Sequence, residues 1–231
     1  IKDLDISNRS GPNKKETDDE DIKKLLKKMV KQRAESIEIY KEVGLPETVV
    51  TRFDIVKMTG THGIGHTRMA TESAVTTMGA HQFNTGSDQC LVHNGSLSNH
   101  NSLRRKLRRE NIRIETENDT EVAAAYLTWK LQNGSSLGEA LESSLNALDG
   151  FFTFVVGTKE GFGVVRDPIA CKPAVMAETD AYVAFGSEYR ALERLPNIEK
   201  ARISEPDPAN VYFWNHSYGK VGVTCAWPPR T

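Results

Sequence analysis

The chain has 231 residues, of which 38% are hydrophobic and 26% are charged, and its 30 basic and 31 acidic residues give a net charge of −1. This length can bury a substantial core, so we expect one large domain or one and a half. Without a basic excess or an apolar run of about 18 residues, the sequence predicts neither a nucleic-acid partner nor a membrane span. The three cysteines, at positions 90, 171 and 225, have no paired spacing, so we expect neither a disulfide framework nor a structural zinc site. Scattered cysteines of this kind are typical of a protein in the reducing cytoplasm.

The N-terminal part of the chain differs in character from the rest. Residues 1–20 are predicted to be a disordered or linking segment, because residues 7–20 are polar and end in three consecutive acids. From Asp21, apolar residues at helical spacing predict an amphipathic helix with a lysine-rich face. Such a helix can bind a membrane or a partner, although a solvated surface helix is the simpler interpretation. Residues 36–43 continue the helical pattern, and Gly44 and Pro46 are expected to end it.

Beyond Pro46 the pattern changes between strands and helices. Helices are expected at residues 99–109, 119–132 and 137–148. Residues 60–68 and 89–93 are expected to be the buried ends of strands, and residues 112–114 a short strand. Two hairpins are expected, one pairing 151–157 with 162–166 and the other pairing 175–177 with 182–187. Because the helices lie between groups of strands rather than in strict βαβ alternation, the pattern predicts an α+β layered sandwich.

Three short polar segments carry the candidate site residues. The first, Gly-His-Thr-Arg-Met-Ala-Thr at residues 65–71, presents Arg68 in a run of small and weakly polar side chains. A guanidinium in such a place either pairs with an internal acid or binds the carboxylate of a ligand through two parallel hydrogen bonds. Its spacing in the sequence leaves both possibilities open.

The second segment is His-Asn-Gly-Ser-Leu at residues 93–97. The Asn94 amide and the unshielded backbone N–H of Gly95 are donors that suit a developing oxyanion. Because apolar residues precede this pair and a predicted helix follows it, we expect a turn between a strand and a helix. The alternative is an ordinary Asn-Gly hairpin turn.

The third segment is Asn-Asp-Thr-Glu at residues 118–121, where Asp119 can accept from an ammonium group or cap the following helix. Together, the three segments offer partners for a carboxylate, an ammonium group and a distant carbonyl. Glutamine carries all three of these groups, so the segments predict a glutamine site.

In this order the three segments closely resemble the glutaminase domain of class-II (N-terminal-nucleophile) glutamine amidotransferases. The run from Thr61 to Ser73 is most similar to the stand-alone amidotransferase subunits akin to glutamate synthase, and the subunit of N-methylglutamate synthase is the nearest relative we would name. The resemblance covers roughly residues 36–214. We therefore expect an N-terminally incomplete amidotransferase domain at 21–214, preceded by the linking segment 1–20 and followed by a tail at 215–231.

The resemblance implies a four-layer αββα sandwich that hydrolyses the glutamine side-chain amide to glutamate and ammonia. It implies that Arg68, Thr71 and Asp119 bind the substrate, and that Asn94 and Gly95 form the oxyanion hole. His81 resembles a residue of the loop that closes over the substrate. No metal or organic cofactor is implied in this domain. The ammonia would pass to partner synthase subunits, so a hetero-oligomer is expected.

The nucleophile that the resemblance implies has no counterpart in this sequence. The family uses an N-terminal cysteine, whereas this chain begins at Ile1 and its first cysteine is Cys90, inside an apolar run. We expect the native protein to supply the cysteine, and we predict that this chain alone is inactive. The alternative is a non-catalytic glutamine-binding or scaffolding subunit that has lost the nucleophile.

Histidines offer a further alternative. His62, His66 and His93 could suggest a metal-dependent hydrolase, but no carboxylate or thiolate accompanies them at metal-ligand spacing. We therefore expect these histidines to make hydrogen bonds in the core beneath the site.

Overall fold

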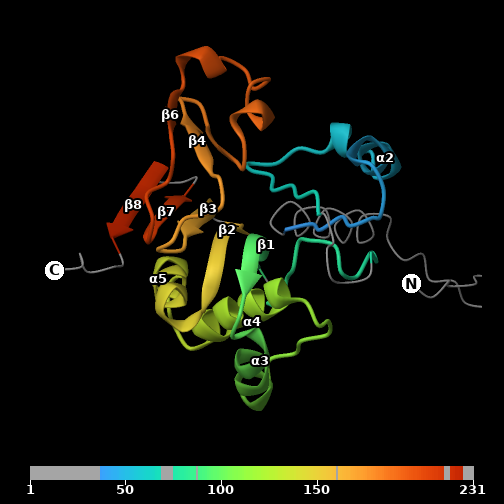
Figure 1. Cartoon of the computed structure of the whole chain (residues 1–231). Coiled ribbons are helices and arrows are strands. Elements are labelled where there is room, and N and C mark those ends of the chain that lie inside the picture. The colour runs from blue at the N-terminus through green and yellow to red at the C-terminus, as the bar shows by residue number, and fades with distance from the viewer. Residues whose placement is uncertain (1–36, 69–74, 87, 160, 216–218, 226–231) are drawn as a thin grey trace, which may run out of the picture. The chain divides into compact units, whose positions relative to one another are not determined.

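The computed structural model describes residues 37–68, 75–86, 88–159, 161–215 and 219–225. The chain divides into two compact units, residues 1–36 and residues 37–231. The expected linking segment and amphipathic helix fall in the first unit and lie outside the described residues. All the elements named below belong to the second unit (Figure 1).

The larger sheet has five strands in the order β1-β2-β3-β7-β8, and every neighbouring pair is antiparallel. Its strands are β1 (Cys90–Leu97), β2 (Gly150–Thr158), β3 (Gly161–Arg166), β7 (Asn210–Asn215) and β8 (Gly219–Cys225). Strand β8, which falls in the expected tail, therefore extends this sheet at the edge beside β7.

The smaller sheet has three antiparallel strands in the order β5-β4-β6. They are β4 (Val175–Glu178), β5 (Val183–Gly186) and β6 (Arg202–Ser204), with the 3-10 turns η2 (Tyr189–Ala191) and η3 (Ile198–Lys200) between β5 and β6. The two hairpins expected from the sequence are thus confirmed, as β2 with β3 and β4 with β5.

Two helices, α4 (Asp119–Gln132) and α5 (Leu137–Ala147), pack against the larger sheet, and α3 (His100–Arg109) packs on α4. Helix α5 begins with a capping box between Ser136 and Glu139, which satisfies backbone donors that a helix start leaves free. In α4, residues 120–128 are all buried, as expected for a helix that is covered on every side. The sequence predicted all three helices within one residue of these bounds.

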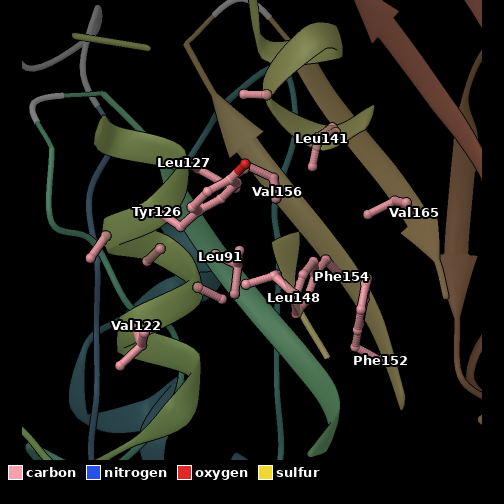
Figure 2. Packing of buried hydrophobic residues seen from close by; sticks show 14 of the residues in the cluster. Leu91, Val122, Tyr126, Leu127, Leu141, Leu148, Phe152, Phe154, Val156 and Val165 are labelled. Atoms are coloured by element: carbon pink, nitrogen blue, oxygen red, sulfur yellow. The ribbon is translucent and has the colours of Figure 1, made fainter. Parts of the chain in front are cut away.

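Strand β2 separates two hydrophobic clusters because its side chains alternate between the two faces of the sheet. Phe152, Phe154 and Val156 pack with α4 and α5, as Figure 2 shows. Val155 points the other way and joins Met176 of the smaller sheet. The described residues therefore stack as helices, larger sheet and smaller sheet. This arrangement confirms the α+β class and supplies three layers of the expected αββα sandwich.

The structure corrects several local expectations. Residues 37–43 are not helical, and Pro46 begins helix α2 (Pro46–Arg52) instead of ending a helix, since proline fits the first helical position well. A 3-10 turn, η1 (Ile55–Lys57), follows α2. Residues 60–68 form no strand, and Gln82 donates its side-chain amide to the Ile64 carbonyl there.

The strand expected at residues 112–114 is also absent. Ile112 and Ile114 are both buried, which explains their alternating pattern. The backbone N–H groups that follow, at Glu115 and Thr116, donate to the Glu121 carboxylate at 2.7 and 2.6 Å rather than to a neighbouring strand. Among the described helices, none is long and apolar enough to cross a membrane.

Candidate active site

Asn94 and Gly95 lie inside strand β1, where they pair with Thr153 and Phe152 of β2. The expectation of a strand-to-helix turn was therefore wrong, because β2 continues to pair with β1 as far as Leu97. By alternation along β1, Asn94 shares the face of Val92, which packs toward the smaller sheet. His93 lies on the opposite face, where its ring meets the Phe154 ring edge-on, with the two ring centroids 5.0 Å apart.

Gly95 occupies a position that only glycine fits. Its φ of +151° is rare for other residues, and a Cβ atom there would lie 2.0 Å from the Phe151 carbonyl oxygen. It would also lie 2.8 Å from Nε2 of His93. The tight packing of β1 against β2 at this point therefore requires the absence of a side chain.

Asp119 is the first residue of α4 but does not cap it. The cap is Asn118, whose side chain accepts from the Thr120 N–H at 2.9 Å. The Asp119 carboxylate turns instead to β1, where Oδ2 accepts from the Leu97 N–H at 3.0 Å. With about a quarter of its side chain exposed, Asp119 can still reach a ligand.

Arg68 is half-buried, and its Nη1 donates to the Gly79 carbonyl at 2.6 Å. Two residues before it, His66 stacks on His81, with ring centroids 4.2 Å apart and planes 18° apart. The segment that carries Arg68 is thus held against the loop at residues 79–83. Thr71, the remaining expected substrate-binding residue, lies outside the described residues.

Histidines connect these segments. Thr120 Oγ1 lies 3.2 Å from Nδ1 of His93 and 3.3 Å from Nε2 of His81. His93 Nδ1 also lies 3.9 Å from Asp119 Oδ2. The structure therefore brings the loop of His81, the strand of Asn94 and the start of α4 together at one place.

Burial keeps these histidines neutral. Desolvation is the main cause that lowers the pKa of His81 to about 2, with the charges of His66, His93, Arg68 and Lys41 acting in the same direction. Desolvation also lowers the pKa of His93 to about 4, although the Asp119 carboxylate opposes it. The pKa of His66 is lowered by burial as well, against a hydrogen bond to the His93 backbone. Near pH 7 these rings are therefore uncharged.

The two cysteines whose side chains are described are both free. Cys90 is buried, and burial raises the pKa of its thiol to about 11, so very little thiolate forms near neutral pH. Cys171 is exposed, on the turn between β3 and β4. Within the described ranges, no group of three or more histidine, cysteine, aspartate or glutamate side chains is arranged to hold a metal ion.

The sequence predicted Arg68, Asn94, Gly95 and Asp119 as site residues but gave no role to Thr120. It gave His93 only a hydrogen-bonding role in the core, and it did not foresee the stacking of His66 on His81. The only signal in the sequence was the position of Thr120 directly after Asp119. A buried hydroxyl with histidine partners 27 and 39 positions away leaves no local pattern.

Known proteins resemble the chain in sequence and in fold. Residues 66–194 match the glutamine amidotransferase domain family. The glutamine amidotransferase-like protein GlxB of Rhizobium meliloti is 76% identical over 79% of this chain and 60% of its own length. A putative glutamine amidotransferase of Methanothermobacter thermautotrophicus is 38% identical over 83% of this chain and 64% of its own length. The chain therefore spans about three fifths of these curated relatives.

The glutamine phosphoribosylpyrophosphate amidotransferase of B. subtilis, solved with ADP and GMP, has a similar fold, with a TM-score of 0.66 and 25% identity. That match covers 80% of this chain and 39% of the B. subtilis enzyme. The layered α+β fold is thus that of the N-terminal-nucleophile amidotransferases. Because the family match covers more than half of its residues, this chain belongs to the class-II glutamine amidotransferase domain family.

Proposed function

We propose that this domain hydrolyses the side-chain amide of glutamine to glutamate and ammonia. The observation that carries the proposal is the contact between the strand of Asn94 and Gly95 and the start of α4, where Asp119 accepts from the N–H of Leu97, two residues beyond Gly95. In this proposal Arg68 and Thr71 bind the α-carboxylate end of glutamine and Asp119 binds its ammonium group. Asn94 and the Gly95 N–H then act on the amide at the far end.

The chemistry proposed is acyl transfer to a cysteine thiolate at the N-terminus of the complete protein, whose own α-amino group takes the thiol proton. Attack on the amide carbon forms a tetrahedral oxyanion, which Asn94 and Gly95 stabilise. Ammonia leaves, and water releases glutamate from the thioester. The high pKa of Cys90 argues against Cys90 as a substitute nucleophile.

Ammonia is useful only beside a site that consumes it. We therefore propose that the domain works in a hetero-oligomer with synthase subunits akin to glutamate synthase, as the run from Thr61 to Ser73 suggests. The matched region fills only part of the B. subtilis amidotransferase, which supports a domain that serves a larger enzyme. The free thiols of Cys90 and Cys171 suit the cytoplasmic location that we propose.

The test is glutamate release from L-glutamine by the complete protein with its native N-terminus, and by its Asn94→Ala variant. An oxyanion donor acts mainly on the transition state, so kcat should fall by about 10²–10³-fold with little change in KM. Asn133→Ala, at the far end of α4, is the matched control and should leave both constants unchanged.

The alternative is a non-catalytic glutamine-binding subunit. Glutamine binding by the complete protein without any release of glutamate would favour that alternative. A fall in kcat that is equal in the Asn94 and Asn133 variants would contradict the role given to Asn94.

A further inference from the structure

Thr120 is completely buried, and its hydroxyl lies between two imidazole rings. Oγ1 is 3.2 Å from Nδ1 of His93 and 3.3 Å from Nε2 of His81. The helix cap involves only the backbone of Thr120, whose N–H donates to the Asn118 side chain, and it does not use the Thr120 hydroxyl. The hydroxyl is therefore available to the two histidines and, at 3.5 Å, to Oδ1 of Asp119.

The number of protons limits how this bridge can form. A threonine hydroxyl has one hydrogen to donate, so it cannot donate to both ring nitrogens. At least one of the two facing nitrogens must carry the N–H. Both rings are neutral near pH 7, with pKa values of about 4 for His93 and about 2 for His81, so each ring holds a single proton. The bridge consequently excludes the state in which His93 Nδ1 and His81 Nε2 are both unprotonated.

The bridge joins the segments that carry the candidate site residues. His93 immediately precedes Asn94, and Thr120 immediately follows Asp119. His81 stacks on His66, two residues before Arg68, and Arg68 donates to Gly79, two residues before His81. One hydroxyl thus connects the strand of the oxyanion donors, the helix of the ammonium acceptor and the loop that holds the arginine.

We propose that Thr120 is a positioning residue that sets the spacing between Arg68, Asp119 and the Asn94–Gly95 pair. The inference rests on the proposed function, because it concerns the same bound glutamine. A ligand that is bound at both ends requires the residues at the two ends of the site to keep a fixed separation. A displacement of about 1 Å in those residues is enough to impair such a site. Without the hydroxyl, two buried ring nitrogens lose their shared partner and the three segments can shift relative to one another.

The experiment uses the 231-residue chain and makes the same substitution, threonine to valine, at two positions of helix α4. Thr120→Val removes the bridging hydroxyl while keeping the volume of the side chain. Thr128→Val is the matched control, because Thr128 is also buried on α4 and its hydroxyl bonds to Thr85 and Gln89, outside the site. Thr120→Ser, which retains the hydroxyl, is the rescue variant.

Two readouts are measured on each protein: the ring ¹⁵N chemical shifts of His81 and His93, and the affinity for L-glutamine by titration calorimetry. We expect Thr120→Val to change both rings' shifts and to weaken glutamine binding on the order of tenfold. Thr120→Ser should restore both readouts. Thr128→Val should lower stability without changing either readout.

Each contrary result has a distinct meaning. If the parent spectrum shows His93 Nδ1 and His81 Nε2 both unprotonated, the bridge is overturned without any variant having to fold. If Thr120→Val changes the ring shifts but weakens glutamine no more than Thr128→Val does, the positioning role is overturned. If the parent chain itself does not bind glutamine while its rings respond to Thr120→Val, the positioning role for glutamine is overturned and the bridge remains. Glutamate release by the complete protein tests the proposed function separately.

Discussion

Nε2 of His93 lies 2.8 Å from the point at which a Cβ atom would stand on Gly95. The histidine that contacts Thr120 on one side thus packs against the backbone of the proposed oxyanion donor on the other. This contact joins the conformation of β1 at Gly95 to the buried histidines, and it makes the glycine a structural requirement as well as a proposed functional one.

Gly95→Ala should destabilise the domain by about 3 kcal/mol or more, because the added methyl group would meet the Phe151 carbonyl oxygen at 2.0 Å. Gly44→Ala is the control that separates backbone strain from steric overlap. Gly44 has a similar φ of +146°, but a Cβ atom there would have nothing within 4 Å. The control should lose only about 1 kcal/mol. Urea unfolding of both variants measures the difference, and equal losses would contradict the packing described at Gly95.

Arg68→Lys should weaken glutamine binding by about tenfold or more, even though the charge is kept, because an ammonium group cannot match a carboxylate through two parallel hydrogen bonds. Arg113→Lys is the control, since Arg113 is exposed and pairs with Glu115 away from the site. Titration calorimetry compares the two variants with the parent chain. Unchanged affinity in the Arg68 variant would remove Arg68 from the site.

Stability should fall as the pH is lowered from about 6.5 toward 4. Burial lowers the pKa of His93 from 6.5 to about 4, so between these values the unfolded chain binds a proton that the folded chain does not. Stability is therefore present above the unfolded pKa and is lost as the pH falls, by on the order of 3 kcal/mol for this group.

The measurement is urea unfolding at pH 7.0, 6.0 and 5.0 for the parent, His93→Gln and His100→Gln. His93→Gln should reduce the dependence on pH and leave the part that comes from His81 and His66, whose pKa values are also lowered by burial. His100→Gln, at the start of α3, should retain the dependence of the parent. A parent stability that rises on acidification over this interval would show that the folded protein binds the proton more readily.

Cys90 should be inert in the folded chain and Cys171 reactive. Cys90 is buried and its thiol pKa is raised to about 11, whereas Cys171 is exposed. With a thiol-specific reagent at pH 8, Cys171→Ser should remove a fast-reacting thiol from the native protein. Cys90→Ser should change the count only after unfolding. Glutamate release by this chain that disappears on Cys90→Ala substitution would contradict the inert role.

The sequence allowed the helices to be predicted well because their signals are local. The bounds of α4 follow from its apolar content and from the polar residues at its start, although it is Asn118 rather than Asp119 that caps the helix. The continuation of β1 through Gly95 depends on pairing with β2, more than fifty residues away, and no local pattern encodes it. Ile112 and Ile114 alternate like a strand because both are buried, but Glu121 takes the backbone donors after them.

The candidate site likewise contains residues that local sequence could predict and contacts that it could not. Arg68, Asn94 and Asp119 were predicted because each is a polar or charged residue beside apolar sequence, and Gly95 because a glycine leaves its backbone N–H unshielded. Thr120 and the stacking of His66 on His81 depend on which loops meet in space. Such contacts involve ordinary residues whose importance comes only from their partners.

The central claim is that Arg68, Asp119 and the Asn94–Gly95 pair bind one glutamine. A crystal structure of the chain soaked with L-glutamate, the reaction product, tests it most directly. The α-carboxylate should lie on Arg68, the ammonium group on Asp119 and the side-chain carboxylate beside Asn94 and the Gly95 N–H. Glutamate bound elsewhere, or bound with its side-chain carboxylate on Arg68, would show that these residues do not form a glutamine site.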